Sequence, residues 1–292
     1  MEEINTRCGL SLPINYLAGD PRIEEEFLYR DHFKAPATFL KALKAAGVAS
    51  IEIRAIKADT DRNNAAAAAE QILDAGLDVT IHGYLPPNGS GQRFEEVLPS
   101  IAPIAQEIKD RNRSAVITLH CYRELDGDLP RMVNTNADFV KRLARMIGDQ
   151  NLPLRIALEI NRNKNYTDPS ITYDSLTRLL SEIAEPGLVG FCWDFGHSFW
   201  NASKKYIDVM PPKRFLNEVI HTHIHDLSRE GETHWPLTEK AIPLTDFVSS
   251  LKGRNYAGTY NLELRPERWQ GVIDAKTGIF ESISVLAEKL QS

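Results

Sequence analysis

Short apolar runs rich in β-branched residues recur along the chain, and segments with helical spacing of their apolar positions separate them. Buried strands of a parallel sheet have this near-continuous apolar character, whereas amphipathic helices show a period of about 3.6 residues. The runs predict strands over residues 7–15, 50–56, 78–84, 115–122, 155–161, 189–197, 219–226 and 259–264.

Helical segments lie between these strands. Residues 37–47 have helical spacing and end at Gly47, and the alanine-rich stretch 59–76 ends at Gly76. Glycine readily adopts the left-handed conformation that follows a helix. The glycine-containing stretch 86–92 predicts a loop over one mouth of the sheet. Further helices are predicted over residues 93–110, 136–148, 170–184, 211–218, 243–252 and 274–291.

Strands that alternate with helices and are joined by right-handed crossovers form a parallel sheet. Eight such units predict a closed (β/α)8 TIM barrel, in which functional residues gather at the C-terminal mouth of the strands. An open doubly wound sheet usually carries a glycine-rich turn after its first strand, and no such turn follows residues 7–15. No linker or low-complexity segment divides the chain, so we predict a single TIM-barrel domain over residues 1–292.

Composition agrees with this prediction and disfavours other classes of protein. The 292 residues are 42% hydrophobic and 25% charged, as in globular proteins with a large core. The net charge of −6 provides no basic footprint for nucleic acid. No apolar stretch approaches the roughly 20 residues that span a bilayer, and the acidic N-terminus does not resemble a signal peptide. Cys8, Cys121 and Cys192 lie far apart in strand-like runs, which indicates buried thiols and a cytoplasmic location.

Six of the predicted strands end on a side chain that can bind a metal ion. Successive strand residues face opposite sides, so Glu159 faces away from its apolar neighbours Leu158 and Ile160. The apolar face predicts packing on helices, and the acidic face then points into the barrel. In chain order the strand-end residues are His82, His120, Glu159, Asp194 with His197, the trio His221, His223 and His225, and Glu263.

Each of these residues also has a purely structural explanation. Glu159 or Glu263 can pair with an arginine such as Arg265, and His82 and His120 can be hydrogen-bonded core histidines. Several converging carboxylates without compensating charge would nevertheless be very costly to bury, whereas a divalent cation stabilises them together. The convergence of the strand ends therefore predicts a metal site.

The HTHIHD run places His221, His223 and His225 on one strand face. Residues two apart on a strand are too widely spaced for all three to reach one metal. One of them is therefore expected to be structural, or to be turned aside by a bulge. The following Asp226 is expected to cap or orient a neighbour rather than to bind the metal.

Four motifs, ALEIN, WDFGH, HTHIHD and NLEL, occur in this order on the predicted strands. In these motifs the chain resembles the xylose-isomerase-like TIM barrels, which join sugar isomerases and epimerases to AP endonucleases of the endonuclease-IV type. The resemblance implies a divalent metal (Mn²⁺, Mg²⁺, Co²⁺ or Zn²⁺) and no nucleotide cofactor. His223 stands three residues before Asp226, which matches the family's histidine–x–x–aspartate spacing. The metal ligands implied by the resemblance are Glu159, Asp194, His223 and Glu263.

The resemblance first implies an isomerase or epimerase of a sugar, sugar phosphate or polyol. In such an enzyme the metal acts as a Lewis acid, and proton transfer passes through a cis-enediolate. Glu159 and Glu263 would be catalytic, one removing the proton beside the carbonyl and the other returning it. His197 and a second histidine such as His221 would hold substrate hydroxyls, and Arg54 would bind a distal group.

The resemblance also implies an alternative, an endonuclease-IV-like phosphodiester hydrolase with two or three zinc ions. Its additional ligands would be His82, His120, His197, Glu232 and His234, with Glu232 standing in place of an aspartate. Against this alternative, the N-terminal strand lacks that family's glycine- and histidine-bearing opening. A metal-dependent lyase or dehydratase and a non-catalytic sugar-binding module are further alternatives.

These interpretations predict different partners. The favoured one predicts a small sugar-like substrate, and only the hydrolase alternative predicts nucleic acid. Neither predicts contact with a membrane. The resemblance is compatible with a homo-oligomer.

Overall fold

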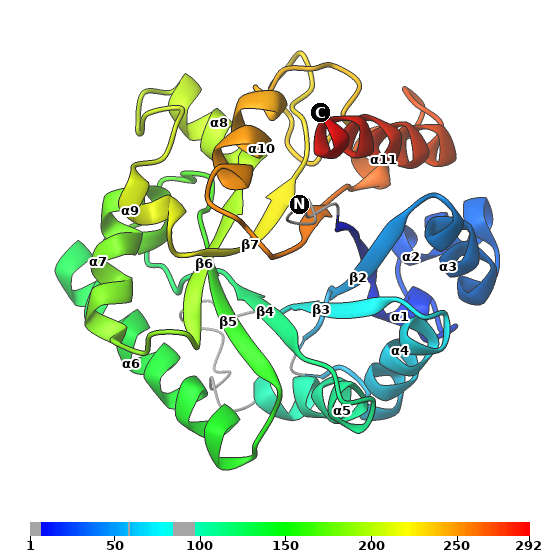
Figure 1. The fold of residues 1–292 in the computed structure, drawn as a ribbon, viewed down its shortest axis with the longest axis horizontal. Helices are drawn as coiled ribbons and strands as arrows, with labels where there is room; N and C mark the ends of the chain where they lie inside the picture. The colour runs from blue at the N-terminus through cyan, green and yellow to red at the C-terminus, as the bar shows by residue number, and fades with distance from the viewer. Residues whose placement is uncertain (1–6, 58, 84–96) are drawn as a thin grey trace.

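The computed structural model describes residues 7–57, 59–83 and 97–292. Within these ranges, parallel strands close into a barrel in sequence order, with β8 paired to β1 (Figure 1). The predicted (β/α)8 TIM barrel is thereby confirmed. The strands are β1 (Cys8–Pro13), β2 (Val48–Arg54), β3 (Asp78–His82), β4 (Ala115–Leu119), β5 (Leu154–Glu159), β6 (Val189–Asp194), β7 (Val219–Ile224) and β8 (Tyr260–Leu262).

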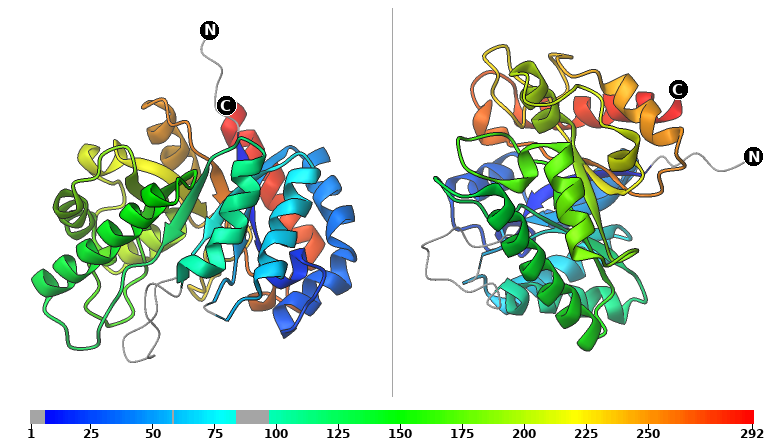
Figure 2. Two further views of the ribbon diagram at one scale, coloured as in Figure 1. Left: turned by 90° about the horizontal axis from the view of Figure 1, so that it is seen from below. Right: turned by 90° about the vertical axis from the view of Figure 1, so that its left-hand side faces the viewer.

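Helices surround the barrel as an outer ring (Figure 2). They are α1 (Ile14–Leu17), α2 (Glu24–Phe33), α3 (Pro36–Ala45), α4 (Arg62–Asp74), α5 (Val97–Asp110), α6 (Leu129–Asp149), α7 (Tyr173–Ile183), α8 (Phe195–Ser203), α9 (Lys213–Leu216), α10 (Leu244–Lys252) and α11 (Ala275–Gln291). Two short 3₁₀ turns, η2 (Pro169–Ile171) and η3 (Pro266–Arg268), lie in the loops that follow β5 and β8. Several helices begin where a polar side chain accepts hydrogen bonds from first-turn N–H groups, as do Asp61, Asp128, Thr172 and Asp274.

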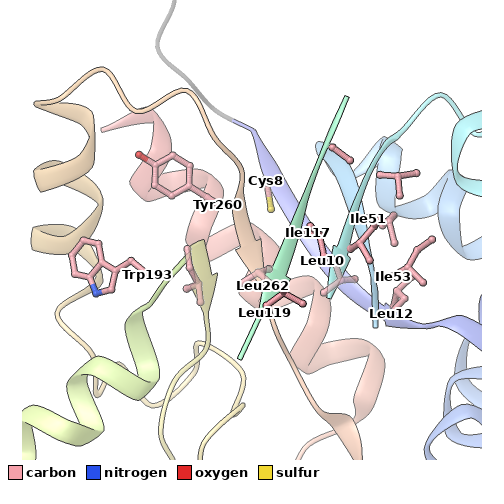
Figure 3. Packing of buried hydrophobic residues seen from close by; sticks show 14 of the residues in the cluster. Cys8, Leu10, Leu12, Ile51, Ile53, Ile117, Leu119, Trp193, Tyr260 and Leu262 are labelled. Carbon is pink, nitrogen blue, oxygen red and sulfur yellow. The ribbon is translucent and has the colours of Figure 1, made fainter. Parts of the chain in front are cut away.

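The two sides of the strand wall differ in polarity. Leu10 and Leu12 of β1 are fully buried, and Leu10 pairs in register with Ile51 of β2 (Figure 3). Burying such a side chain contributes about 1.5–3 kcal/mol. Ser11, between the two leucines, is equally buried but donates its hydroxyl to Glu52 at 2.5 Å. Alternate residues of the strand therefore anchor the wall in the hydrophobic core, while the others bring polar groups into the barrel interior.

Several element boundaries differ from the sequence-based prediction. The prediction extends the sixth strand to residue 197, whereas β6 ends at Asp194 and α8 begins at the next residue. The Asp194 side chain accepts a hydrogen bond from the His197 backbone N–H at 2.6 Å, so a cap ends the strand there. Similarly, α6 begins at Leu129 rather than at residue 136, because Asp128 caps it. Helix α2 is not predicted at all, because its residues EEEFLYRDHF lack a clear apolar stripe.

Three further predictions concern a loop, the cysteines and membrane spans. The predicted loop over residues 86–92 lies outside the described residues. The three cysteines are free and buried, as predicted. In the described part of the chain, no helix combines the length and the apolar character that a membrane span requires.

Candidate metal centre

Four side chains from different parts of the barrel converge at its C-terminal mouth. They are His82 at the end of β3, Glu159 at the end of β5, His223 on β7 and Glu263 just after β8. One ligand atom from each lies within 4.8 Å of the others. His223 Nδ1 is 3.5 Å from Glu159 Oε2 and 3.3 Å from Glu263 Oε2, and His82 Nε2 is 3.4 Å from Glu159 Oε2.

Several ligand atoms of Glu159, His223 and Glu263 are buried without a hydrogen-bond partner in the described structure. Both oxygens of Glu159, Oε2 of Glu263 and Nδ1 of His223 have no hydrogen-bond partner among the described residues. An ionised carboxylate buried in this way is strongly destabilised unless a cation compensates it. Two carboxylates and two imidazoles are donors that suit a divalent transition metal. The residues present therefore fit the metal that the sequence predicts.

Neighbouring acceptors orient both imidazoles toward this space. His223 Nε2 is 2.9 Å from Glu52 Oε2, so Nε2–H donates to Glu52 and Nδ1 faces the carboxylates. His82 Nδ1 is 2.9 Å from the Gly83 carbonyl oxygen, which leaves Nε2 free in the same manner. Metal-binding histidines are typically held by such a hydrogen bond from the second ring nitrogen. The orientation is thus built into the protein before any ion binds.

Glu52 of β2 lies buried below the first group, where Glu52, His221 and His223 form a further, deeper group of possible ligands. Glu52 was not predicted from the sequence. Its Oε2 also accepts from His221 Nε2 at 3.2 Å, and its Oε1 accepts from Ser11 Oγ at 2.5 Å and Asn261 Nδ2 at 3.1 Å. Burial alone would raise the pKa of Glu52, but His223 and His221 outweigh it and hold the pKa well below its usual range. The alternation of β2, which places Glu52 on the polar face, is the signal from which this role could have been predicted.

A second group of possible ligands shares Glu159 with the first. It contains Glu159, Asp194 and His197. His197 Nδ1 is 3.2 Å from Asp194 Oδ2 and 3.4 Å from Glu159 Oε1. Asp194 Oδ2 and His197 Nδ1 are also buried without a hydrogen-bond partner in the described ranges. Of the four ligands implied by the family resemblance, three therefore lie in the first group, and Asp194 lies beside them.

A third group consists of His197, His225 and His234. The rings of His225 and His234 stack with centroids 4.4 Å apart, and His225 Nε2 is 3.2 Å from Asp194 Oδ1. Gly196 makes room for this arrangement, because a Cβ atom there would lie 2.0 Å from His225 Cε1. Burial lowers the pKa of His234 well below its usual value, which favours the neutral imidazole that a metal needs. The sequence analysis did not propose His225 as a ligand.

His120 and Glu232, which were predicted as additional ligands, belong to none of these groups in the described structure. His120 approaches Glu159, with Nε2 2.9 Å from Oε2, and its side chain is 40% exposed at the opening of the site. Glu232 is exposed and belongs to none of the three groups in the described structure. The structure thus does not bring Glu232 to the centre, although His234, two residues further on, is there.

Arg54 and His221, two of the residues predicted to bind substrate, have other partners. The buried guanidinium of Arg54 forms an ion pair with Glu25 and donates to Tyr29 Oη at 3.4 Å; both partners belong to α2. His221 is fully buried below the first group, where it shares Glu52 with His223. Neither side chain is free to bind a substrate in this conformation.

Sequence comparison with protein families identifies the class of protein. Residues 40–289 match the model of the xylose isomerase-like TIM barrel family. The chain belongs to this family, as its strand-end motifs predict. The family includes sugar phosphate isomerases and epimerases as well as endonuclease-like members, and its members are generally enzymes.

Solved structures resemble the chain in fold at low sequence identity. A xylose isomerase domain protein from Alicyclobacillus acidocaldarius is 15% identical, with a TM-score of 0.64 over 98% of this chain and 99% of the other. A sugar phosphate isomerase/epimerase from Parabacteroides distasonis is 15% identical, with a TM-score of 0.59 over 98% and 97%. The IOLI protein with a bound zinc atom is 16% identical, with a TM-score of 0.55 over 97% and 96%. No curated protein matches the chain in sequence.

Proposed function

We propose that this protein is a divalent-metal-dependent isomerase or epimerase of a sugar or a sugar-like polyol. The observation that carries the proposal is the pairing of two buried glutamates, Glu159 and Glu263. The unsatisfied Oε2 of Glu159 faces both His82 Nε2 and His223 Nδ1, and the unsatisfied Oε2 of Glu263 faces the same nitrogen of His223. The zinc atom in the IOLI protein and the name of the Parabacteroides structure support the same class of chemistry.

A bound divalent ion would supply Lewis acidity toward adjacent oxygens of the substrate. His82, Glu159, His223 and Glu263 would hold the ion. Asp194 lies beside this set and is compatible with a further ligand role.

The protein's own groups would then move the proton. Isomerisation of a hydroxycarbonyl compound through a cis-enediolate requires a base beside one carbon and an acid beside its neighbour. Glu159 and Glu263 come from β5 and the end of β8, so they approach the ion from different sides of the barrel. We assign proton removal and return to this pair. Exclusion of water by the buried walls would strengthen their electrostatic interaction with the substrate.

Hydrogen exchange with solvent tests this role directly. Metal-loaded protein is incubated in D₂O with a panel of ketoses and cyclic polyol ketones, and deuterium in the recovered substrate is measured by mass spectrometry. The proposal predicts incorporation at one carbon beside the carbonyl, and its loss in Glu159→Gln and in Glu263→Gln. Full exchange in both variants would remove the two glutamates from the mechanism. The buried Glu26→Gln variant, which leaves the site intact, is the control.

A phosphodiester hydrolase is the second candidate, and one observation favours it. The three ligand groups overlap through Glu159 and His197 and together contain more donors than one ion uses. Against it, Glu232 is exposed and leaves the third group with imidazoles alone. The hydrolase predicts two or three tightly held zinc atoms per chain and cleavage of abasic DNA, with loss of metal in His120→Ala.

A further inference from the structure

Four cationic side chains lie on the loops at the metal-bearing mouth of the barrel. Arg123 follows β4, Arg162 and Lys164 follow β5, and Arg268 lies in η3 after β8. We call these residues the cationic cluster. Within the described part of the chain, none of the four forms an ion pair, although the nearby Arg131 and Arg265 both have carboxylate partners.

Hydrogen bonds fix the loop that carries Arg162 and Lys164. On one side, Thr167 pairs with Glu124 of the β4 loop through two backbone hydrogen bonds of 3.2 and 2.7 Å. On the other side, the Asn163 backbone N–H donates to Asn201 of α8 at 3.0 Å. The loop is therefore held between the β4 loop and α8 at the mouth.

Aromatic rings hold the two arginines of this region in place. The Arg123 guanidinium lies 4.7 Å from the ring centroid of Tyr166, and that of Arg162 lies 5.3 Å from Trp200. Stacking on an aromatic face orients a guanidinium while its N–H edge stays available to an oxyanion. Prior orientation of this kind reduces the entropy that binding costs.

Contact with Tyr166 places Arg123 beside the loop that carries Lys164, and Lys164 senses the charges of the other three cations. Partial desolvation, followed by the charges of Arg123 and Arg162, lowers the pKa of Lys164, and Arg268 contributes in the same direction. The charge of Glu159 opposes this lowering, so Lys164 also lies within electrostatic reach of the first ligand group. Clustered like charges destabilise the free protein, and an anion would relieve that repulsion.

We propose that the cationic cluster is a subsite for the phosphate group of a small phosphate monoester, held while the rest of the substrate reaches Glu159. This inference rests on the proposed function and specifies its substrate class. A dianionic phosphate matches several cations better than a single carboxylate does, because arginine forks bind phosphate oxygens in pairs. A monoester, rather than a nucleic acid strand, fits a local cluster on a chain with a net charge of −6.

The test compares two probes that differ only in a phosphate group. Binding of glycerol and of glycerol 3-phosphate to metal-loaded protein is measured by calorimetry at constant ionic strength. The proposal predicts that the phosphate improves affinity at least about tenfold in the native protein, as charge-assisted hydrogen bonds do. In the Arg162→Gln/Lys164→Gln double variant, most of that preference should disappear while the metal content stays unchanged.

Matched controls separate the subsite from other sources of phosphate affinity. Arg178→Gln removes an exposed charge from α7, outside the cluster, and should keep the preference. An unchanged preference in the double variant would show that phosphate binds the metal alone and would overturn the proposal. Equal loss in Arg178→Gln would also overturn it, because only the net charge would matter. Tighter binding of an abasic oligonucleotide, weakened in the same double variant, would replace the monoester with a nucleic acid backbone.

The proposed function can fail separately from the subsite. Absence of deuterium exchange in every ketose, together with loss of phosphate preference in the double variant, would leave the subsite and remove the isomerase. Deuterium exchange with an unphosphorylated ketose, combined with no phosphate preference, would leave the isomerase and remove the subsite.

Discussion

At the scale of single residues, Glu52 has the largest influence on the geometry of the candidate centre. It is not a member of the first group of possible ligands, yet it fixes the ring nitrogen that His223 presents there. Its four hydrogen bonds come from Ser11, His221, His223 and Asn261, so its carboxylate is fully satisfied although it is completely buried. The carboxylate thus selects the tautomer of His223 and strengthens its donor atom.

Replacing Glu52 with Gln tests this positioning role. Both imidazoles donate to the same oxygen, Oε2, so the amide can keep its oxygen there only by turning its NH₂ group toward Ser11 Oγ and the donor Asn261 Nδ2. In either orientation the negative charge that holds the imidazole N–H groups is lost. We expect metal affinity to fall about 10- to 100-fold, as for other residues that support a metal ligand. Competition with a fluorescent chelator measures the change.

The matched control is Glu26→Gln, another buried carboxylate that accepts from Asn15 Nδ2 and from the backbone N–H groups of Arg22 and Ile23. It contacts none of the candidate ligands in the described structure. Native affinity in Glu52→Gln, with the protein folded, would show that His223 is oriented by packing alone.

The protonation of His82 gives the centre a pH dependence of defined sign. Burial lowers the pKa of His82, but Glu159 and Glu263 outweigh it and raise the pKa to about 9 in the metal-free protein. A metal must therefore displace a proton from His82 at any pH below about 9. We expect affinity to increase by at least about tenfold per pH unit up to that value, because His82 releases a proton when the ion binds and the pKa of His223 is raised as well.

Calorimetric titration at several pH values, in buffers with different ionisation enthalpies, measures the proton release. The His82→Gln variant should show a shallower dependence, since its amide carries no titrating proton. A pH-independent affinity in the native protein between pH values of about 6 and 9 would be inconsistent with a role for His82 as a ligand.

At the scale of elements, the strand ends were predictable from the sequence, whereas helix α2, which contacts Arg54 at the end of β2, was not. The runs that end at His82, Glu159 and His223 alternate clearly, so the sequence places their donors at the mouth of the barrel. Helix α2 has no comparable pattern, and it carries Glu25 and Tyr29, the partners of Arg54. Because α2 was not predicted, the partners of the Arg54 guanidinium were not foreseen, and Arg54 was assigned to the substrate instead.

The ion pair between Glu25 and Arg54 makes a prediction about stability. Glu25→Gln would leave a buried guanidinium without its counter-charge, which typically costs roughly 3 kcal/mol or more. The free energy of unfolding in urea measures the effect. The double variant Glu25→Leu/Arg54→Met, which removes both charges, should recover most of the loss. A change below about 0.5 kcal/mol in Glu25→Gln would show that Glu267 or solvent compensates Arg54.

At the scale of the whole molecule, closure of the barrel decides which donors meet. The sequence shows that donors stand at six strand ends, but His82 and His223 come from β3 and β7, which are not neighbours in the barrel. Their stacked rings, with centroids 5.2 Å apart, result from inward side chains that cross the barrel interior. Local patterns carry no information about such pairs, so the division into separate groups could not be predicted.

The three histidines in and just after β7 have different roles for the same reason. Successive inward positions descend through the layers of the barrel. His225 lies at the mouth beside Asp194, His223 faces the two glutamates, and His221 lies below with Glu52. In the described structure no group of possible ligands contains all three, which agrees with the expectation that they do not share one ion. One of the three was expected to be structural, and His221, which is hydrogen-bonded to Glu52, fits that role.

The central claim is that the buried donors at the barrel mouth form a divalent-metal centre, and elemental analysis tests it most directly. Native protein, Glu159→Gln and the control Glu26→Gln are purified without chelator and without a histidine tag, and metal atoms per chain are determined. The account predicts about one divalent atom per chain in the native protein and in Glu26→Gln, exchangeable for manganese or cobalt, and a clear loss in Glu159→Gln. Native protein that contains no divalent metal, and that binds none when manganese, cobalt or zinc is supplied, would contradict it.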